Sequence, residues 1–71
     1  MRGPHKLDTA TIDAKVTRKS PGNYILGRKN LEGNFRAGYV GRSDSDIGAI
    51  LKSRVGVTKQ LLFKFSYAKE Q

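Results

Sequence analysis

The chain has 71 residues, 37% of them hydrophobic and 28% charged, and its 14 lysines and arginines against six acidic residues give a net charge of +8. This size allows one small domain, the composition excludes a disordered tail, and the absence of cysteine excludes disulfides and thiolate zinc sites. Because no stretch approaches the roughly 20 apolar residues of a membrane span and residues 1–6 lack the apolar region of a signal peptide, we expect an intracellular, cytoplasmic protein.

The first part of the chain predicts a flexible segment followed by a strand. Residues 1–10 are polar and show no periodicity, which is typical of a flexible N-terminal arm, and residues 11–71 are then the single folded domain. Apolar and polar side chains alternate over residues 11–17, which predicts a half-buried strand with one apolar face made of Ile12, Ala14 and Val16. Pro21 and Gly22 form a turn signal that ends this strand.

Two further strand-like runs predict a β-hairpin. Residues 24–26 and 35–40 have the composition of strands, and residues 28–34 between them are rich in turn formers and charge. This loop is longer than the optimal two residues. We therefore expect side-chain pairing, and not the turn, to set the register of the hairpin.

The periodicity changes after Gly41 from that of a strand to that of a helix. Apolar residues then recur at the spacing of one helical face, at Ile47, Ile50, Leu51 and Val55. Ser43 and Asp46 resemble a capping box at the start of this helix, and Gly56 is placed to end it.

The last apolar run, residues 61–68, is the strongest predicted strand. One of its faces carries Phe63, Phe65 and Tyr67, which we interpret as packing against the sheet or helix, with a base-stacking platform as the alternative. The predicted order is strand, strand, strand, helix, strand. This order predicts an α+β fold, a mainly antiparallel sheet of three or four strands with one helix packed on one face.

Two short motifs carry a resemblance to a known family. Gly22-Asn23-Tyr24 and Tyr39-Val40-Gly41 each lie in a predicted strand, with the hairpin between them, a helix after them and a strand later. In this order the residues resemble the two motifs of the GIY-YIG nuclease superfamily, over about residues 21–68. The predicted strand at residues 11–17 lies outside the resemblance.

The resemblance implies a metal-dependent hydrolysis of phosphodiester bonds, with Mg²⁺ or Mn²⁺ as the cofactor. In that family a motif tyrosine helps to activate water, an arginine on the next helix stabilises the phosphate, and a glutamate on a later helix holds the cation. Tyr24 and Tyr39 match the motif tyrosines and are the candidate catalytic residues. Gly22 and Gly41 match the motif glycines and are expected to serve the structure.

The remaining features of the family do not transfer to this sequence. The position of the helix arginine is occupied by Ile50, which cannot stabilise a phosphate and fits a buried helical stripe. The sequence given ends at Gln71, so we expect no later helix, and Glu70 is a poor substitute for its glutamate. No metal ligand is therefore assigned, and a catalytically impaired member of the family is the favoured hypothesis.

The positive charge favours a polyanionic partner. We expect nucleic acid, DNA more than RNA. Six basic residues are the candidate nucleic-acid contacts: Arg28, Lys29, Arg36, Arg42, Lys52 and Arg54. The plainer alternatives are that Arg54 only complements the helix dipole, that Arg42 is only solvated, and that the charge serves solubility. Two other functions stay open, namely an active metal-dependent endonuclease and a structural or interaction protein that forms a homodimer through a strand edge.

Overall fold

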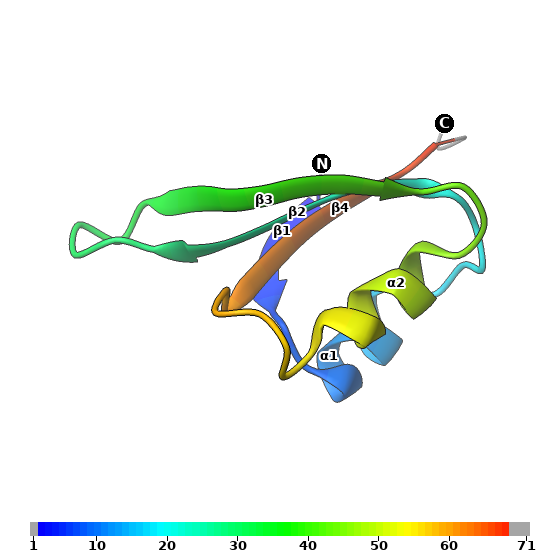
Figure 1. Ribbon diagram of the computed structural model, residues 1–71, viewed down its shortest axis with the longest axis horizontal. Coiled ribbons are helices and arrows are strands. Elements are labelled where there is room, and N and C mark those ends of the chain that lie inside the picture. Colours follow the sequence, from blue (N-terminus) through cyan, green and yellow to red (C-terminus); the bar gives the residue numbers. More distant parts are fainter. Residues whose placement is uncertain (1, 69–71) are drawn as a thin grey trace.

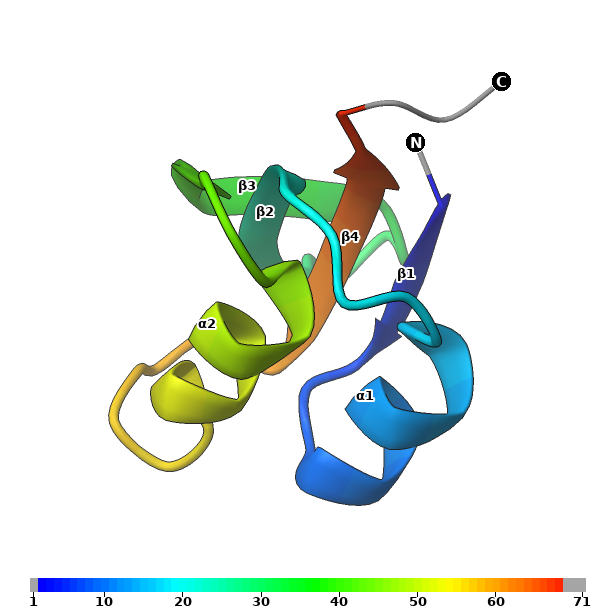
Figure 2. The same cartoon turned by 90° about the vertical axis from the view of Figure 1, so that its right-hand side faces the viewer.

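A four-stranded antiparallel sheet carries both helices on one of its faces (Figures 1 and 2). The computed structural model describes residues 2–68. Their elements, in chain order, are β1 (Arg2–Lys6), α1 (Thr9–Lys15), β2 (Gly22–Lys29), β3 (Phe35–Ser43), α2 (Ile47–Arg54) and β4 (Leu62–Tyr67). The strands lie in the order β1-β4-β2-β3. The predicted α+β class and antiparallel sheet are confirmed, with two helices in place of one.

Strand β1 lies within the segment that the sequence predicts to be a flexible arm. It pairs with β4, with Arg2 opposite Phe65 and His5 opposite Phe63. β1 is an edge strand, where Pro4 is tolerated because one side of such a strand needs no hydrogen-bond donors. The interpretation of residues 1–10 as a flexible arm is therefore wrong for residues 2–6, because pairing with β4 orders a segment that has no apolar pattern of its own. It is also wrong for residues 8–10, which form the cap and the first residues of α1.

Helix α1 replaces the strand predicted at residues 11–17. The carboxylate of Asp8 accepts a hydrogen bond from the backbone N–H of Thr11 at 2.7 Å and caps the helix. Ile12 and Val16 are buried, whereas Ala14 is exposed. Residues four apart share a helical face, so the two buried side chains fit a helix. The prediction of a strand at residues 11–17 is therefore wrong.

Strands β2 and β3 form the predicted hairpin, which continues beyond the rest of the sheet. Tyr24 lies opposite Gly41 and Leu26 opposite Tyr39, after which a bulge makes Gly27 the partner of Ala37. β4 pairs with β2 only as far as Gly27. Residues 28–36 therefore project as a two-stranded extension, here called the basic ribbon, at the left of Figure 1.

The core lies between the helices and the inner face of the sheet. Ile47 and Leu51 of α2 are fully buried against it, and Ile50 packs beside them, as the helical spacing predicts. The three aromatic residues of β4 are buried, which confirms their role in packing. The buried hydrophobic residues of the sheet are Tyr24, Leu26, Phe63, Phe65 and Tyr67.

The end of α2 agrees with its sequence signal, whereas its start differs from the expected capping box, because Asp46 and not Ser43 is the N-cap. The carboxylate of Asp46 caps the first turn by accepting from the N–H of Ala49 at 3.2 Å, while the Ser43 hydroxyl accepts from the N–H of Asp46. Gly56 follows the helix with φ +81°, a conformation that favours glycine. Neither helix within residues 2–68 has the length and apolar character needed to cross a membrane.

Candidate nucleic-acid interface

The two motif tyrosines lie next to each other on the inner face of the sheet. Tyr24 pairs with Gly41 and Leu26 pairs with Tyr39, so both rings project on the side of the helices. Their centroids are 6.0 Å apart with an angle of 35° between the ring planes. Tyr24 is only 1% exposed, whereas Tyr39 is 49% exposed. Of the two, Tyr39 is therefore the ring that a ligand can reach.

The motif glycines make room for this arrangement. A Cβ atom added to Gly41 would lie 2.6 Å from the hydroxyl oxygen of Tyr24 and 2.7 Å from its ring carbon Cζ. A Cβ atom added to Gly22 would collide with the backbone carbonyl of Ser66 and approach Ile47 to 3.1 Å. Both glycines are thus explained by close packing in the sheet.

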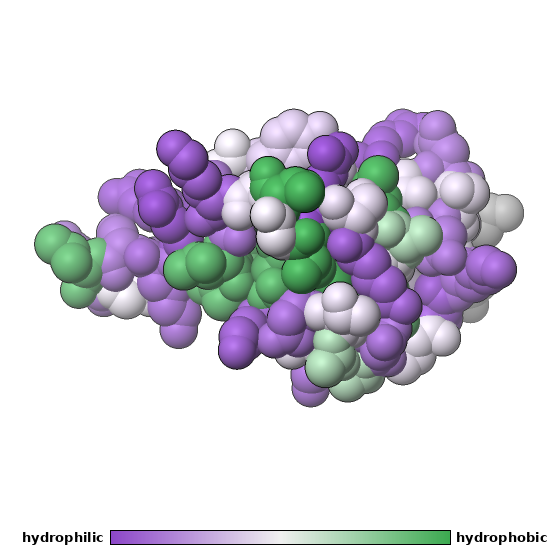
Figure 3. Space-filling model, turned by 60° about the horizontal axis from the view of Figure 1, so that its bottom comes forward, coloured by the Kyte–Doolittle hydropathy of each residue, from purple (hydrophilic) through white to green (hydrophobic). Residues whose placement is uncertain are grey.

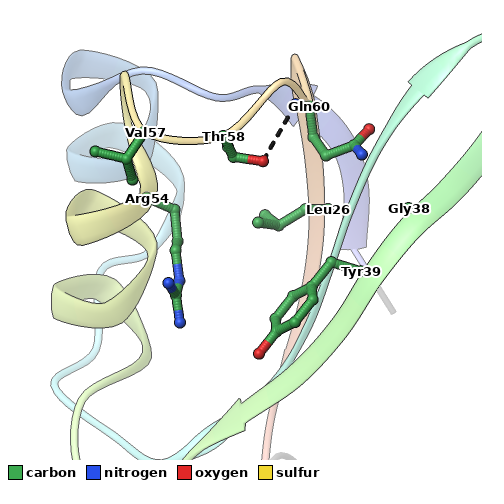
Figure 4. A pocket seen from close by; sticks show the side chains of 7 residues that line it. All are labelled: Leu26, Gly38, Tyr39, Arg54, Val57, Thr58 and Gln60. Carbon is green, nitrogen blue, oxygen red and sulfur yellow. Dashed lines mark hydrogen bonds between the residues drawn. The ribbon is translucent and has the colours of Figure 1, made fainter.

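Arg54, at the end of α2, faces Tyr39 across a shallow cavity of about 330 Å³ (Figure 4). The guanidinium carbon of Arg54 lies 5.7 Å from the centroid of the Tyr39 ring, a cation–π distance. Its Nε atom is shielded from solvent and has no hydrogen-bond partner within residues 2–68. The other residues that line the cavity are Leu26, Gly38, Val57, Thr58 and Gln60.

Arg54 is therefore the arginine that the fold brings to the motif tyrosines. Ile50, which the resemblance places at the family's arginine position, is partly buried and packs against the hydrophobic core. Arg54 lies four residues later, one helical turn further along the same side of α2. The sequence names Arg54 only as one of several candidate cations, because the position of β3 beside the end of α2 is set by tertiary packing.

The residues around this cavity do not fit a divalent cation. No carboxylate or histidine belongs to its lining. Over residues 2–68, no three histidine, cysteine, aspartate or glutamate side chains gather in a way that could hold a metal ion. Glu70, a poor substitute ligand by its sequence position, lies outside the described residues.

The basic ribbon holds three of the six predicted nucleic-acid contacts. Arg28 and Arg36 are directly opposite each other on the two strands, and both are exposed. Lys29 is the next residue and projects from the other face. Within the described part of the chain, none of the three forms an ion pair with an acidic residue. The ribbon thus carries uncompensated positive charge on both faces.

Of the three predicted contacts outside the ribbon, Arg54 lies at the cavity and the other two have acidic partners. Nη2 of Arg42 lies 2.7 Å from Oδ1 of Asp44, and Nε of Arg42 also donates to that oxygen at 3.1 Å. Lys52 on α2 forms an ion pair with Asp13 on α1. Both cations remain exposed, but their positive charge is largely balanced locally, so they contribute less to a basic surface than the ribbon does.

The ribbon tip holds two residues that no sequence motif marks as functional. Asn30 organises the turn, since its side-chain oxygen accepts hydrogen bonds from the N–H groups of Glu32 at 2.9 Å and Asn34 at 3.0 Å. Leu31, beside it, is fully exposed at the end of the ribbon. The available signal was a lone apolar residue within a run of polar turn formers.

The comparisons with known proteins leave the chain without a demonstrated family. No family model matches it, and no curated protein or solved structure matches it either. The likeness to the GIY-YIG nucleases consequently stays a resemblance based on the two tyrosine motifs and the elements around them. Any function must be argued from the residues themselves.

Proposed function

We propose that this chain binds nucleic acid, DNA in preference to RNA, through its basic ribbon and does not cut it. The observation that carries the proposal is the cross-strand pair Arg28 and Arg36. Like charges directly opposite each other destabilise a hairpin. A phosphate bound at this pair would offset the repulsion, because each guanidinium can donate two hydrogen bonds to it.

The shape of the ribbon favours DNA. A two-stranded ribbon can enter the grooves of B-form DNA, whereas the major groove of A-form RNA is too deep and narrow for side chains to read. The net charge of +8 adds a long-range attraction to either polyanion. Groove access and charge together support duplex DNA as the first ligand to test.

Two observations support binding without cleavage. Tyr24 is enclosed by the core, so its ring is a packing element and a poor candidate for activating water. Ile50 occupies the position of the family's phosphate-stabilising arginine and packs against the core. A surface that holds the phosphate backbone needs neither of these groups.

A salt titration with charge variants tests the proposal. The dissociation constant for a fluorescein-labelled duplex would be measured by anisotropy between about 50 and 200 mM salt. Each lost phosphate contact reduces the slope of log K against log salt by about 0.9, so Arg28→Gln with Arg36→Gln should reduce it by about 2.

The matched control removes two exposed cations outside the ribbon, Lys19→Gln with Lys59→Gln, and so lowers the net charge by the same amount. This control should leave the slope nearly unchanged. Equal effects of the two double variants would mean that binding follows net charge alone. Failure of the unaltered chain to bind at the lowest salt would eliminate the proposed function.

A second candidate is an endonuclease that uses Tyr39 and Arg54. The observation in its favour is the 5.7 Å contact between the arginine and the exposed ring beside a cavity. Incubation with supercoiled plasmid and Mg²⁺ or Mn²⁺ would reveal nicking. Nicking that disappears in Tyr39→Phe and in Arg54→Gln would support this candidate over the first, while no nicking by the unaltered chain would remove it.

A third candidate is self-association through β3. This strand pairs only with β2 and therefore lies at the edge of the sheet, and its residue Val40 is 68% exposed. Free strand edges can pair with a second copy. Light scattering that gives twice the mass of the chain, together with no binding to DNA, would favour this candidate.

A further inference from the structure

The tip of the basic ribbon carries a hydrophobic side chain with no packing role. Leu31 has a relative exposure of 107%, the highest among the exposed large hydrophobic residues of the described chain. In Figure 3 the left end of the molecule shows a hydrophobic group (green) next to hydrophilic side chains (purple). A leucine in this position contributes nothing to the core, so its chemistry is available for an interaction outside the chain.

The turn presents Leu31 in a fixed position. The N–H of Asn30 donates to the carbonyl of Asn34 at 2.9 Å, and the N–H of Gly33 donates to the carbonyl of Asn30 at 3.0 Å. Gly33 has φ +82°, as in three-residue hairpin loops that end in a left-handed residue. Together with the two bonds to the Asn30 side chain, these contacts order the turn without using the Leu31 side chain.

The base of the ribbon is also packed. A Cβ atom on Gly27 would lie 2.7 Å from Cζ of Phe35, so the Phe35 ring covers this glycine. Nζ of Lys64, on the neighbouring strand β4, lies 4.7 Å from the centroid of the same ring. These contacts anchor the ribbon to the four-stranded sheet and hold its orientation relative to the body of the molecule.

We propose that Leu31 is a wedge that inserts between adjacent base pairs from the minor groove and kinks the duplex. This inference rests on the proposed function, DNA binding by the basic ribbon. Proteins that bend DNA in this way insert an apolar side chain at a base step and hold the flanking phosphates with cations. Here the cations are Arg28 and Arg36 on one face of the ribbon and Lys29 on the other.

The arrangement of these cations suits a ribbon that enters end-on. Successive strand residues project to opposite faces, so each face of the ribbon can meet the phosphates on one rim of the groove while the tip points at the bases. Glu32 is the one acidic residue in the ribbon, and it lies in the turn beside Leu31. Three cations in residues 28–36 outweigh this single carboxylate, so the ribbon keeps a net positive charge.

An anionic membrane is the competing partner for a basic element with an apolar tip. The outer edges of residues 28–36 carry backbone groups that are not paired within the four-stranded sheet, and hydrocarbon would leave such groups unsatisfied. A single leucine also supplies little membrane affinity, since even a whole acyl chain binds only marginally. DNA insertion requires only the side chain to leave water.

The test compares Leu31→Ser with Leu61→Ser. Leu61 is a second exposed leucine, 66% accessible, which lies outside the ribbon and so provides a matched control. The probe is a duplex with 2-aminopurine beside a central TA step, which is easily kinked, and with a donor and acceptor dye at its ends. Unstacking raises the 2-aminopurine emission, and bending raises the energy transfer.

The unaltered chain and Leu61→Ser should raise both signals. Leu31→Ser should keep the salt slope of the unaltered chain, lose both signals and bind about tenfold more weakly, the loss expected for one buried leucine side chain. Circular dichroism should show the same fold in both variants, because each replaces an exposed side chain.

The remaining outcomes separate this inference from the proposed function. Binding by the unaltered chain with signals that Leu31→Ser retains would overturn the wedge and leave DNA binding in place. No binding to the duplex at low salt would overturn the proposed function itself. Leu31-dependent binding to phosphatidylserine vesicles without bending of DNA would overturn the wedge in favour of a membrane.

Discussion

The ring of Tyr24 on β2 lies over the backbone of Gly41 on β3, at the position where the two residues pair. This contact joins the first tyrosine motif to the second. It also gives the second-motif glycine a physical reason that does not depend on catalysis. Because glycine has no Cβ atom, the aromatic ring can fill the space beside its Cα.

The contact predicts that Gly41→Ala destabilises the fold. The added Cβ would lie 2.6 Å from the Tyr24 hydroxyl oxygen, and neither the strand nor the buried ring can move away easily. Overpacking of this kind typically costs about 1–3 kcal/mol of the free energy of unfolding, which urea titration would measure. Gly38→Ala is the control, because its Cβ would meet only the flexible end of Gln60. Equal losses in the two variants would contradict the explanation.

Tyr67 is predicted to hold the segment after α1 against the sheet. Its hydroxyl accepts hydrogen bonds from the N–H groups of Thr17 at 3.1 Å and Arg18 at 3.3 Å. Tyr67→Phe removes the acceptor for both, which should lower the free energy of unfolding by about 1–2 kcal/mol. Tyr39→Phe should change it little, since that ring is half exposed. Thermal unfolding that shifts equally in both variants would argue against this role.

Two neighbouring aspartates are predicted to differ in their effect on stability. Asp46 caps α2, so Asp46→Ala should cost about 1 kcal/mol, while Asp46→Asn should retain most of the cap. Asp44 only pairs with Arg42 at the surface, where both side chains are more than 70% exposed. Asp44→Ala should therefore be nearly neutral in urea unfolding. A loss at Asp44 as large as that at Asp46 would contradict the assignment of the cap.

The cross-strand pair predicts a gain in stability on removal of charge. Arg28→Gln should raise the free energy of unfolding by about 0.2–1 kcal/mol at low salt, because it removes repulsion from Arg36. The gain should shrink as salt screens the charges. Arg42→Gln, which removes a cation that has an acidic partner, should give no such gain. A destabilised Arg28→Gln would mean that the pair has a favourable contact in the free protein.

His5 predicts a fall in stability on mild acidification. Partial burial, beside the Phe63 ring at 5.4 Å, lowers the pKa of His5 below 6.5, and the charge of Lys15 lowers it further. The unfolded chain then binds the proton more tightly, so stability should be complete above pH 6.5 and decline as the pH falls from there to the folded pKa. Urea unfolding of His5→Gln should lack this decline. A variant with the same pH profile as the unaltered chain would refute the assignment.

A second pH window belongs to Asp8. The hydrogen bond from the Thr11 N–H lowers the pKa of this carboxylate below 3.8. Its contribution to stability is therefore present above pH 3.8 and is lost as the pH falls through the folded pKa. The pKa of His5 is lowered from 6.5 and that of Asp8 from 3.8, so a decline that begins below pH 6.5 and is seen above pH 3.8 belongs to His5 and can be measured separately.

The elements that a single sequence predicts correctly are those with their own periodic pattern. β4 alternates buried aromatic residues with partly exposed ones, and α2 combines a cap, an apolar stripe and a glycine stop. Helix α1 was predicted as a strand because Ile12 and Val16 satisfy both periodicities. The decisive signal was the cap at Asp8, in a segment assigned to the flexible arm. β1 had no pattern to read, since its order comes from pairing with β4.

The candidate site was predictable in part for the same reason. The two motifs indicated that Tyr24 and Tyr39 belong to neighbouring strands, and their pairing places both rings on one face. Their different exposure could not be read from the sequence, because it depends on how α2 crosses the sheet. The position of Arg54 above Tyr39 depends on the same crossing. The Arg28 and Arg36 pair required the register after the bulge, which no local residue pattern fixes.

The central position of β4 has a consequence for the synthesis of the protein. β4 is the last strand of the described chain, yet it lies between β1 and β2 and holds the two together. During translation the hairpin of β2 and β3 can form early, while β1 has no partner until residues 62–67 leave the ribosome. The nascent chain must therefore keep its apolar helix faces exposed until synthesis of the sheet is almost finished, and chaperones would meet it in that state.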